Sequence, residues 1–109
     1  MPNRTIRSVA LCVALSLGVV ACGDEIGLPA DADPQLLQGL DVYRARCARC
    51  HGPTGGGGIG PNIQEVEAKL DDEQQRTVVV DGRNNMPRFG STLSEADIDA
   101  VVRFTREIL

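Results

Sequence analysis

Cys47-Ala48-Arg49-Cys50-His51 is the stretch of this sequence that decides the fold. Two thiols three positions apart, at the end of a helix, can each reach one vinyl group of the same porphyrin. The next residue, His51, then lies under the metal as its proximal ligand. Cys-x-x-Cys-His is the attachment signature of a c-type haem, so the motif predicts one covalently bound, iron-containing haem.

Zinc binding, thiol redox chemistry and a structural disulfide are other possible roles of this motif, and the rest of the chain supports them less than haem attachment. A closed structural zinc site takes four ligands, whereas the motif offers three, and residues 33–109 hold no further Cys or His. A thioredoxin-like redox pair needs a βαβ context, and none is visible. A structural disulfide between Cys47 and Cys50 stays open as an alternative, because exported domains form disulfides.

A run of glycines follows the motif. Gly55-Gly56-Gly57-Gly58-Ile59-Gly60 matches the letters of G-x-G-x-x-G. No strand precedes the run and Pro61 interrupts any helix after it, so the strand–turn–helix context of a nucleotide site is missing. The run therefore predicts a loop that passes close over the haem edge, where side chains would not fit, and no nucleotide partner.

The first 21 residues indicate a signal peptide of the lipoprotein type. Arg4 and Arg7 form a positive start, and the apolar run over 8–20 has signal-peptide length. Residues 19–22, V-V-A-C, resemble the bacterial lipobox. This resemblance predicts cleavage before Cys22 and a diacylglyceryl group on the Cys22 sulfur. Two acyl chains on one residue would give a stable membrane anchor. An ordinary signal peptide with a loose thiol is the alternative.

Removal of that segment makes the chain more acidic. The first 21 residues hold two arginines and no acid, so 9 basic and 15 acidic residues remain, a formal charge of −6. This charge argues against nucleic acid as a partner and suits a protein with a basic face. Residues 22–32 are predicted to be the lipidated cysteine and a tether of at most about 36 Å, and residues 33–109 the haem domain.

Three main helices are predicted in the haem domain. Asp33 caps a helix over 34–46, which begins with proline and delivers Cys47 at its end. A second helix follows the pair Asp71-Asp72 and runs through residue 80, before Asp81-Gly82. The β-branched run 77–80 could instead be a strand, although no second strand is available to pair with it.

The last helix follows Ser94, with Asp97 three residues on in a capping-box position. Its apolar residues form one broad face that must pack against the domain. They are Ile98, Val101, Val102, Phe104, Ile108 and Leu109, with Thr105 on the same face. The chain is therefore predicted to be all-α, with three main helices and loops wrapped around one haem that supplies much of a thin core.

The sixth iron ligand follows by elimination. His51 is the only histidine, and Met86 is the only methionine beyond the signal segment. Pro87 holds Met86 extended, in a polar loop that can turn the side chain back to the haem. Methionine is more often core filler, but a lone Met in such a loop is poorly placed for that role. His/Met ligation raises the reduction potential and fills both axial positions.

With these pieces in order, residues 33–109 resemble a class I cytochrome c of the short, bacterial, monohaem kind. Gly39 and Tyr43 resemble the glycine–aromatic pair of that family's first helix. Val101 and Phe104 resemble the last-helix positions that cross the first helix near its glycine. The resemblance implies the compact helical fold of that family.

Two loops carry the resemblance to the iron site. Residues 60–63 resemble the loop whose proline carbonyl accepts the hydrogen bond of the proximal histidine, which implies that Pro61 holds His51. Residues 86–90 resemble the segment of the axial methionine. Only 35 positions separate His51 from Met86, so long family loops are missing and one haem edge is expected to be open.

The resemblance implies a one-electron carrier without catalytic residues, at the periplasmic or extracytoplasmic face of a bacterial membrane, with membrane-bound redox proteins as partners. Lys69 is the sole lysine, so a lysine-ringed docking face is absent. Arg49, Arg83 and Arg88 could neutralise haem propionates or a partner, or be solvated surface charge. The alternative function is a haem enzyme or gas sensor with an open sixth position.

Overall fold

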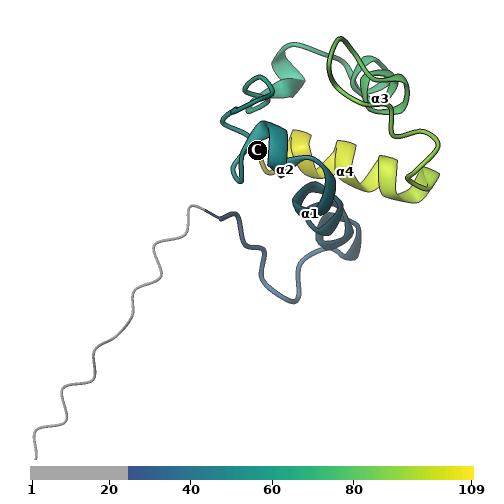
Figure 1. Ribbon diagram of the computed structural model, residues 1–109. Helices are drawn as coiled ribbons and strands as arrows, with labels where there is room; N and C mark the ends of the chain where they lie inside the picture. The colour runs from purple at the N-terminus through teal and green to yellow at the C-terminus, as the bar shows by residue number, and fades with distance from the viewer. Residues whose placement is uncertain (1–24) are drawn as a thin grey trace, which may run out of the picture.

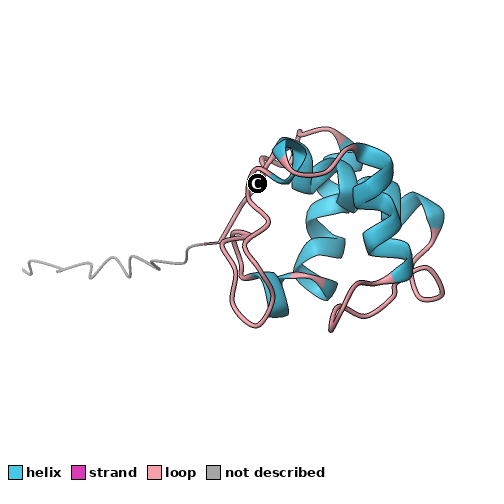
Figure 2. Cartoon of the chain, turned by 90° about the horizontal axis from the view of Figure 1, so that it is seen from above, coloured by secondary structure: helices cyan, strands magenta, loops and turns pink. Residues whose placement is uncertain are grey.

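The computed structural model describes residues 25–109, which are helical and contain no strand (Figure 2). The elements are α1 (Pro34–Arg46), α2 (Ala48–His51), the 3₁₀ helix η1 (Val66–Ala68), α3 (Asp72–Asp81) and α4 (Glu95–Glu107). The all-α prediction with three main helices is confirmed. The predicted signal peptide and Cys22 lie outside the described residues. Within residues 25–109, every helix is too short or too polar to cross a bilayer.

The crossing of α1 and α4 forms the centre of the fold (Figure 1). Gly39 is the point of closest approach, because a Cβ there would lie 2.2 Å from the carbonyl oxygen of Ala100 and 2.6 Å from the Cβ of Phe104. Tyr43 lies beside Phe104 with ring centroids 5.6 Å apart, and both side chains are fully buried. The predicted glycine–aromatic pair therefore meets the last helix as expected.

Side-chain caps set where the helices begin. The carboxylate of Asp33 accepts a hydrogen bond from the backbone of α1 at 2.8 Å, and Asp71 and Ser94 head complete capping boxes on α3 and α4. The three predicted starts are confirmed. The strand alternative for residues 77–80 is wrong, since they form the last turns of α3, which ends at Gly82 with a φ of 74°.

Residues 25–32 lie against the domain. Arg44 of α1 forms an ion pair with Glu25 at 2.9 Å and donates a hydrogen bond to the carbonyl of Ile26 at 2.8 Å. Ile26 and Leu28 are half-buried and pack against the apolar core. Part of the segment expected to be a tether is therefore docked on α1.

Candidate haem-binding site

The Cys-x-x-Cys-His motif forms the junction of α1 and α2. The Cys47 N–H ends α1 by donating to the carbonyl of Tyr43 at 2.8 Å. The carbonyl of Cys47 then accepts from the N–H groups of Cys50 and His51 at 3.0 and 2.9 Å. This single helical turn places the two cysteines on one side. Both are free, half-buried thiols, which are the groups that a c-type haem requires.

Burial controls the acidity of the groups beside this turn. Burial, with a smaller effect of Cys50, raises the pKa of Cys47 to about 11, so its thiol stays protonated at neutral pH. Within the described residues no three His, Cys, Asp or Glu side chains converge on one point, so the four ligands of a closed zinc site are not assembled there. Burial likewise raises the pKa of Tyr43 to about 12, and the Tyr43 hydroxyl donates to the carbonyl of Gly52 at 2.6 Å.

His51 is held with one ring nitrogen occupied. Its Nδ1 lies 2.8 Å from the carbonyl oxygen of Pro61, and the residue is 8% exposed. A carbonyl can only accept, so Nδ1 carries a proton, and in the neutral imidazole Nε2 then keeps a lone pair. Within residues 25–109 every fully buried side-chain nitrogen has a hydrogen-bond partner. The Nε2 of His51 makes no hydrogen bond there, so it is not fully buried. This is the state in which histidine ligates iron.

The glycine run folds back over the motif. Gly57 donates to the carbonyl of His51 and Gly60 to that of Cys50, both at 2.7 Å. Gly57 has a φ of 102°, which disfavours any side chain there. A Cβ on Gly60 would lie 3.1 Å from two ring atoms of His51. The loop can therefore hold the histidine this closely because it lacks side chains.

Met86 lies in a tight turn beyond α3. Its N–H donates to the carbonyl of Arg83 at 2.9 Å, and the N–H of Arg83 donates back to the Met86 carbonyl at 3.3 Å. Asn84, inside the turn, has a φ of 52°, a conformation that asparagine tolerates better than most residues. Met86 itself is half-buried. The polar loop expected around this methionine is present.

His51 and Met86 belong to different structural elements. His51 belongs to the turn after α1, and Met86 to the loop after α3 (Figure 1). The predicted contact between Pro61 and His51 is present, whereas no sequence pattern indicated the contacts that position α3.

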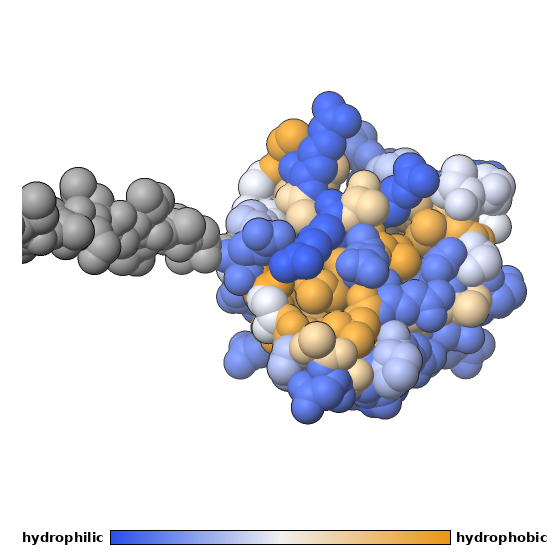
Figure 3. All heavy atoms as spheres, turned by 90° about the horizontal axis from the view of Figure 1, so that it is seen from below, coloured by the Kyte–Doolittle hydropathy of each residue, from blue (hydrophilic) through white to orange (hydrophobic). Residues whose placement is uncertain are grey.

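Two further features bear on a bound porphyrin. On the face shown in Figure 3, hydrophobic residues gather near the centre and hydrophilic residues surround them, an arrangement typical of a binding surface. Arg49, Arg83 and Arg88 are exposed, and none forms an ion pair within the described part of the chain. The donor set and its surroundings fit a c-type haem.

Comparison with known proteins identifies the class. Residues 34–104 match the family model described as cytochrome C oxidase, cbb3-type, subunit III. The chain is 32% identical to cytochrome c-551 of Bacillus subtilis, over 69% of this chain and 72% of that protein. It is 37% identical to cytochrome c-555 of Methylococcus capsulatus, over 87% of this chain and 76% of that protein.

Solved structures show the same fold. Cytochrome c6C from Synechococcus superposes with a TM-score of 0.56 and 29% identity, over 64% of this chain and 92% of that one. Dihydro-heme d1 dehydrogenase NirN superposes with a TM-score of 0.62 and 33% identity, over 66% of this chain but only 16% of that larger protein. The chain belongs to the class I c-type cytochromes and carries one covalently bound, iron-containing haem.

Proposed function

We propose that this chain carries single electrons through a haem held covalently by Cys47 and Cys50 and ligated by His51 and Met86. The contact between His51 Nδ1 and the Pro61 carbonyl, at 2.8 Å, carries the proposal, because it fixes the tautomer that leaves Nε2 for iron. The bound haem supplies a one-electron couple. The cytochrome relatives support this function over catalysis.

Each side chain has a distinct part in that function. Cys47 and Cys50 would hold the porphyrin through two thioether bonds, which fix it beside His51. The soft thioether sulfur of Met86 would favour ferrous iron and raise the reduction potential. With both axial positions filled, a small molecule must displace Met86 to bind, so the site exchanges electrons and does little bond chemistry.

The sixth ligand distinguishes the carrier from an enzyme or gas sensor. The Met86→Ala holoprotein is expected to lose the weak long-wavelength band of methionine sulfur on ferric iron. Its ferrous form should bind carbon monoxide at least tenfold faster than the unchanged protein, because no ligand has to leave first. Absorption spectra and stopped-flow mixing measure both effects. If the unchanged protein lacks the band and binds carbon monoxide at the same rate, the open-site alternative is correct.

We further propose that the domain is exported and anchored to a bacterial membrane through lipid on Cys22. The V-V-A-C pattern at 19–22 supports this location. A periplasmic or extracytoplasmic site would give the acidic domain membrane-bound redox proteins as partners, and neither nucleic acid nor nucleotide.

A cysteine substitution tests the anchor. Cys22→Ser is expected to move the mature haem protein from the membrane pellet to the soluble fraction and to abolish labelling by a lipid precursor. Cys12→Ser is the matched control, because Cys12 lies inside the segment expected to be removed, and it should leave both measurements unchanged. A Cys22→Ser protein that stays in the membrane fraction would contradict the anchor and leave the haem assignment intact.

A further inference from the structure

The loop that contains Met86 is attached to α3 by its backbone. The N–H groups of Phe89 and Gly90 donate to the carbonyls of Val79 and Val80, at 3.0 and 3.1 Å. These carbonyls belong to the last turn of the helix, where no partner within the helix is available. Movement of this loop away from α3 would break both hydrogen bonds. The position of α3 therefore determines the position of Met86.

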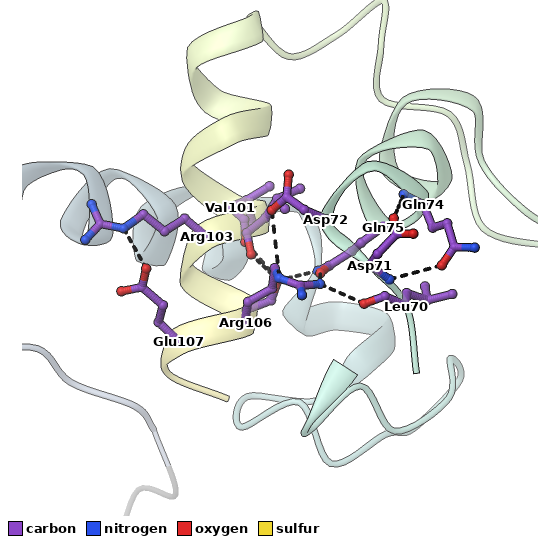
Figure 4. Close-up of polar contacts among 11 residues, drawn as sticks. Leu70, Asp71, Asp72, Gln74, Gln75, Val101, Arg103, Arg106 and Glu107 are labelled. Carbon is purple, nitrogen blue, oxygen red and sulfur yellow. Dashed lines mark hydrogen bonds and ion pairs between the residues drawn. The ribbon is translucent and has the colours of Figure 1, made fainter. Parts of the chain in front are cut away.

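A buried polar cluster holds α3 on α4. Gln75 is the one buried residue of α3, and only Val79 of this helix borders the apolar core. The Nε2 of Gln75 donates to the hydroxyl of Thr105 at 2.6 Å. The guanidinium of Arg106 donates to the Oε1 of Gln75 at 3.0 Å and to the carbonyl of Leu70, just before α3, at 2.9 Å. Figure 4 shows Arg106 between the two helices.

The cluster has every polar group paired. Thr105 lies 3.0 Å from the carbonyls of Val101 and Val102, so its hydroxyl can donate to α4 while it accepts from Gln75. Within the described residues, no fully buried polar side-chain atom is unpaired. A satisfied network of this kind fixes one relative position of two helices, and a partly satisfied one is costly.

A second contact between the same helices is of a different kind. Arg76 forms ion pairs with Glu95 and Asp99, whose side chains are 84% and 53% exposed. Exposed ion pairs contribute little to stability. The cluster around Gln75, which Arg106 extends to Asp72 of α3 by an ion pair at 3.8 Å, is therefore the buried polar contact between α3 and α4. Arg76, one position away, is a matched contact whose acidic partners are exposed.

We propose that Gln75, with Thr105 and Arg106, is a positioning residue for Met86 that sets how long the methionine stays on the iron. This rests on the proposed ligation by Met86. His51 follows α1, α1 packs on α4, and α4 holds α3 through Gln75, so the distance between the two iron ligands depends on this cluster. The cluster contacts neither ligand directly.

The Gln75→Ala holoprotein tests this role. The ferrous variant is expected to bind carbon monoxide about tenfold faster, because one buried and one half-buried hydrogen bond that resist movement of α3 are lost. The amide protons of Phe89 and Gly90 should exchange about tenfold faster by the same reasoning. Thr105→Val, which removes only the hydroxyl, should give both effects, and the double variant should show less than their product.

Arg76→Ala is the control and should change neither rate more than about twofold. Unchanged rates in Gln75→Ala and Thr105→Val, or an equal effect of Arg76→Ala, would overturn the positioning role and leave ligation by Met86 intact. Amide exchange could accelerate in Gln75→Ala while the protein without substitutions lacks the methionine–iron band. In that case the cluster holds the loop without acting on an iron ligand. That result overturns both proposals.

Discussion

Replacing Gly39 by alanine is expected to lower the melting temperature of the haem protein by about 10 °C or more. In an exposed helix this change would stabilise by about 0.5–1 kcal/mol, because glycine is the poorer helix former. Here the added Cβ would lie 2.2 Å from the Ala100 carbonyl oxygen and 2.6 Å from the Phe104 Cβ. No rotation about a side-chain bond relieves either contact, so α1 and α4 must separate.

The size of the effect follows from competing terms. Overpacking a core typically costs about 1–3 kcal/mol and occasionally more, and contact with a backbone atom belongs at the upper end. The net loss is then about 2 kcal/mol, and each kcal/mol shifts the melting temperature of a domain of this size by about 4–8 °C. Thermal melts followed by far-ultraviolet circular dichroism measure it. Gly27→Ala is the control, since a Cβ there meets nothing within 4 Å. A Gly39→Ala protein as stable as this control would refute the crossing.

The second large effect concerns the haem itself. The Cys47→Ala/Cys50→Ala apoprotein is expected to be largely unfolded at 25 °C. The apolar core is small and centres on the crossing of α1 and α4, around Tyr43 and Phe104. The motif turn, the glycine loop and the Met86 loop add little buried apolar area, yet ordering each residue costs about 1–2 kcal/mol. A group that binds only the folded chain supplies the missing free energy.

Circular dichroism and calorimetry distinguish the outcomes for this apoprotein. Weak helical signal without a cooperative transition is expected, beside a sharp transition for the holoprotein. The Ala48→Ser holoprotein is a suitable control, because it alters the motif region and keeps both haem-binding cysteines. A cooperative melt of the double variant near the holoprotein's temperature would show that the helices need no haem.

Local chemistry made the helices predictable. Asp33 and Ser94 cap the helices they were expected to cap, because an N-cap depends on a few neighbouring residues and its side chain. The sequence of residues 77–80 was compatible with either a helix or a strand, since β-branched residues favour strands. The capping box headed by Asp71 and the end at Gly82 decide for helix, and no other strand is present in residues 25–109 to pair with it.

The candidate site was predictable where a motif is short and chemically restrictive. Cys47, Cys50 and His51 lie within five residues that form one turn, and the resemblance correctly implied the contact of Pro61 with His51. Gln75 could not have been found this way. A glutamine within a helix is usually a surface residue, and its partners on α4 lie 30 and 31 positions away. Contacts of this kind depend on tertiary packing, which leaves no local pattern.

The docked N-terminal segment bears on how the protein would search for its partners. Ile26 packs against the apolar core, and with lipid on Cys22, as proposed, only residues 23–25 separate the anchor from that contact. Four residue steps span at most about 14 Å. Rotation of the domain relative to the bilayer is then restricted, and encounters take place in a plane with few orientations to sample. A partner protein would then have to present its docking surface at the height and tilt of the haem domain above the bilayer, in addition to having a complementary surface charge.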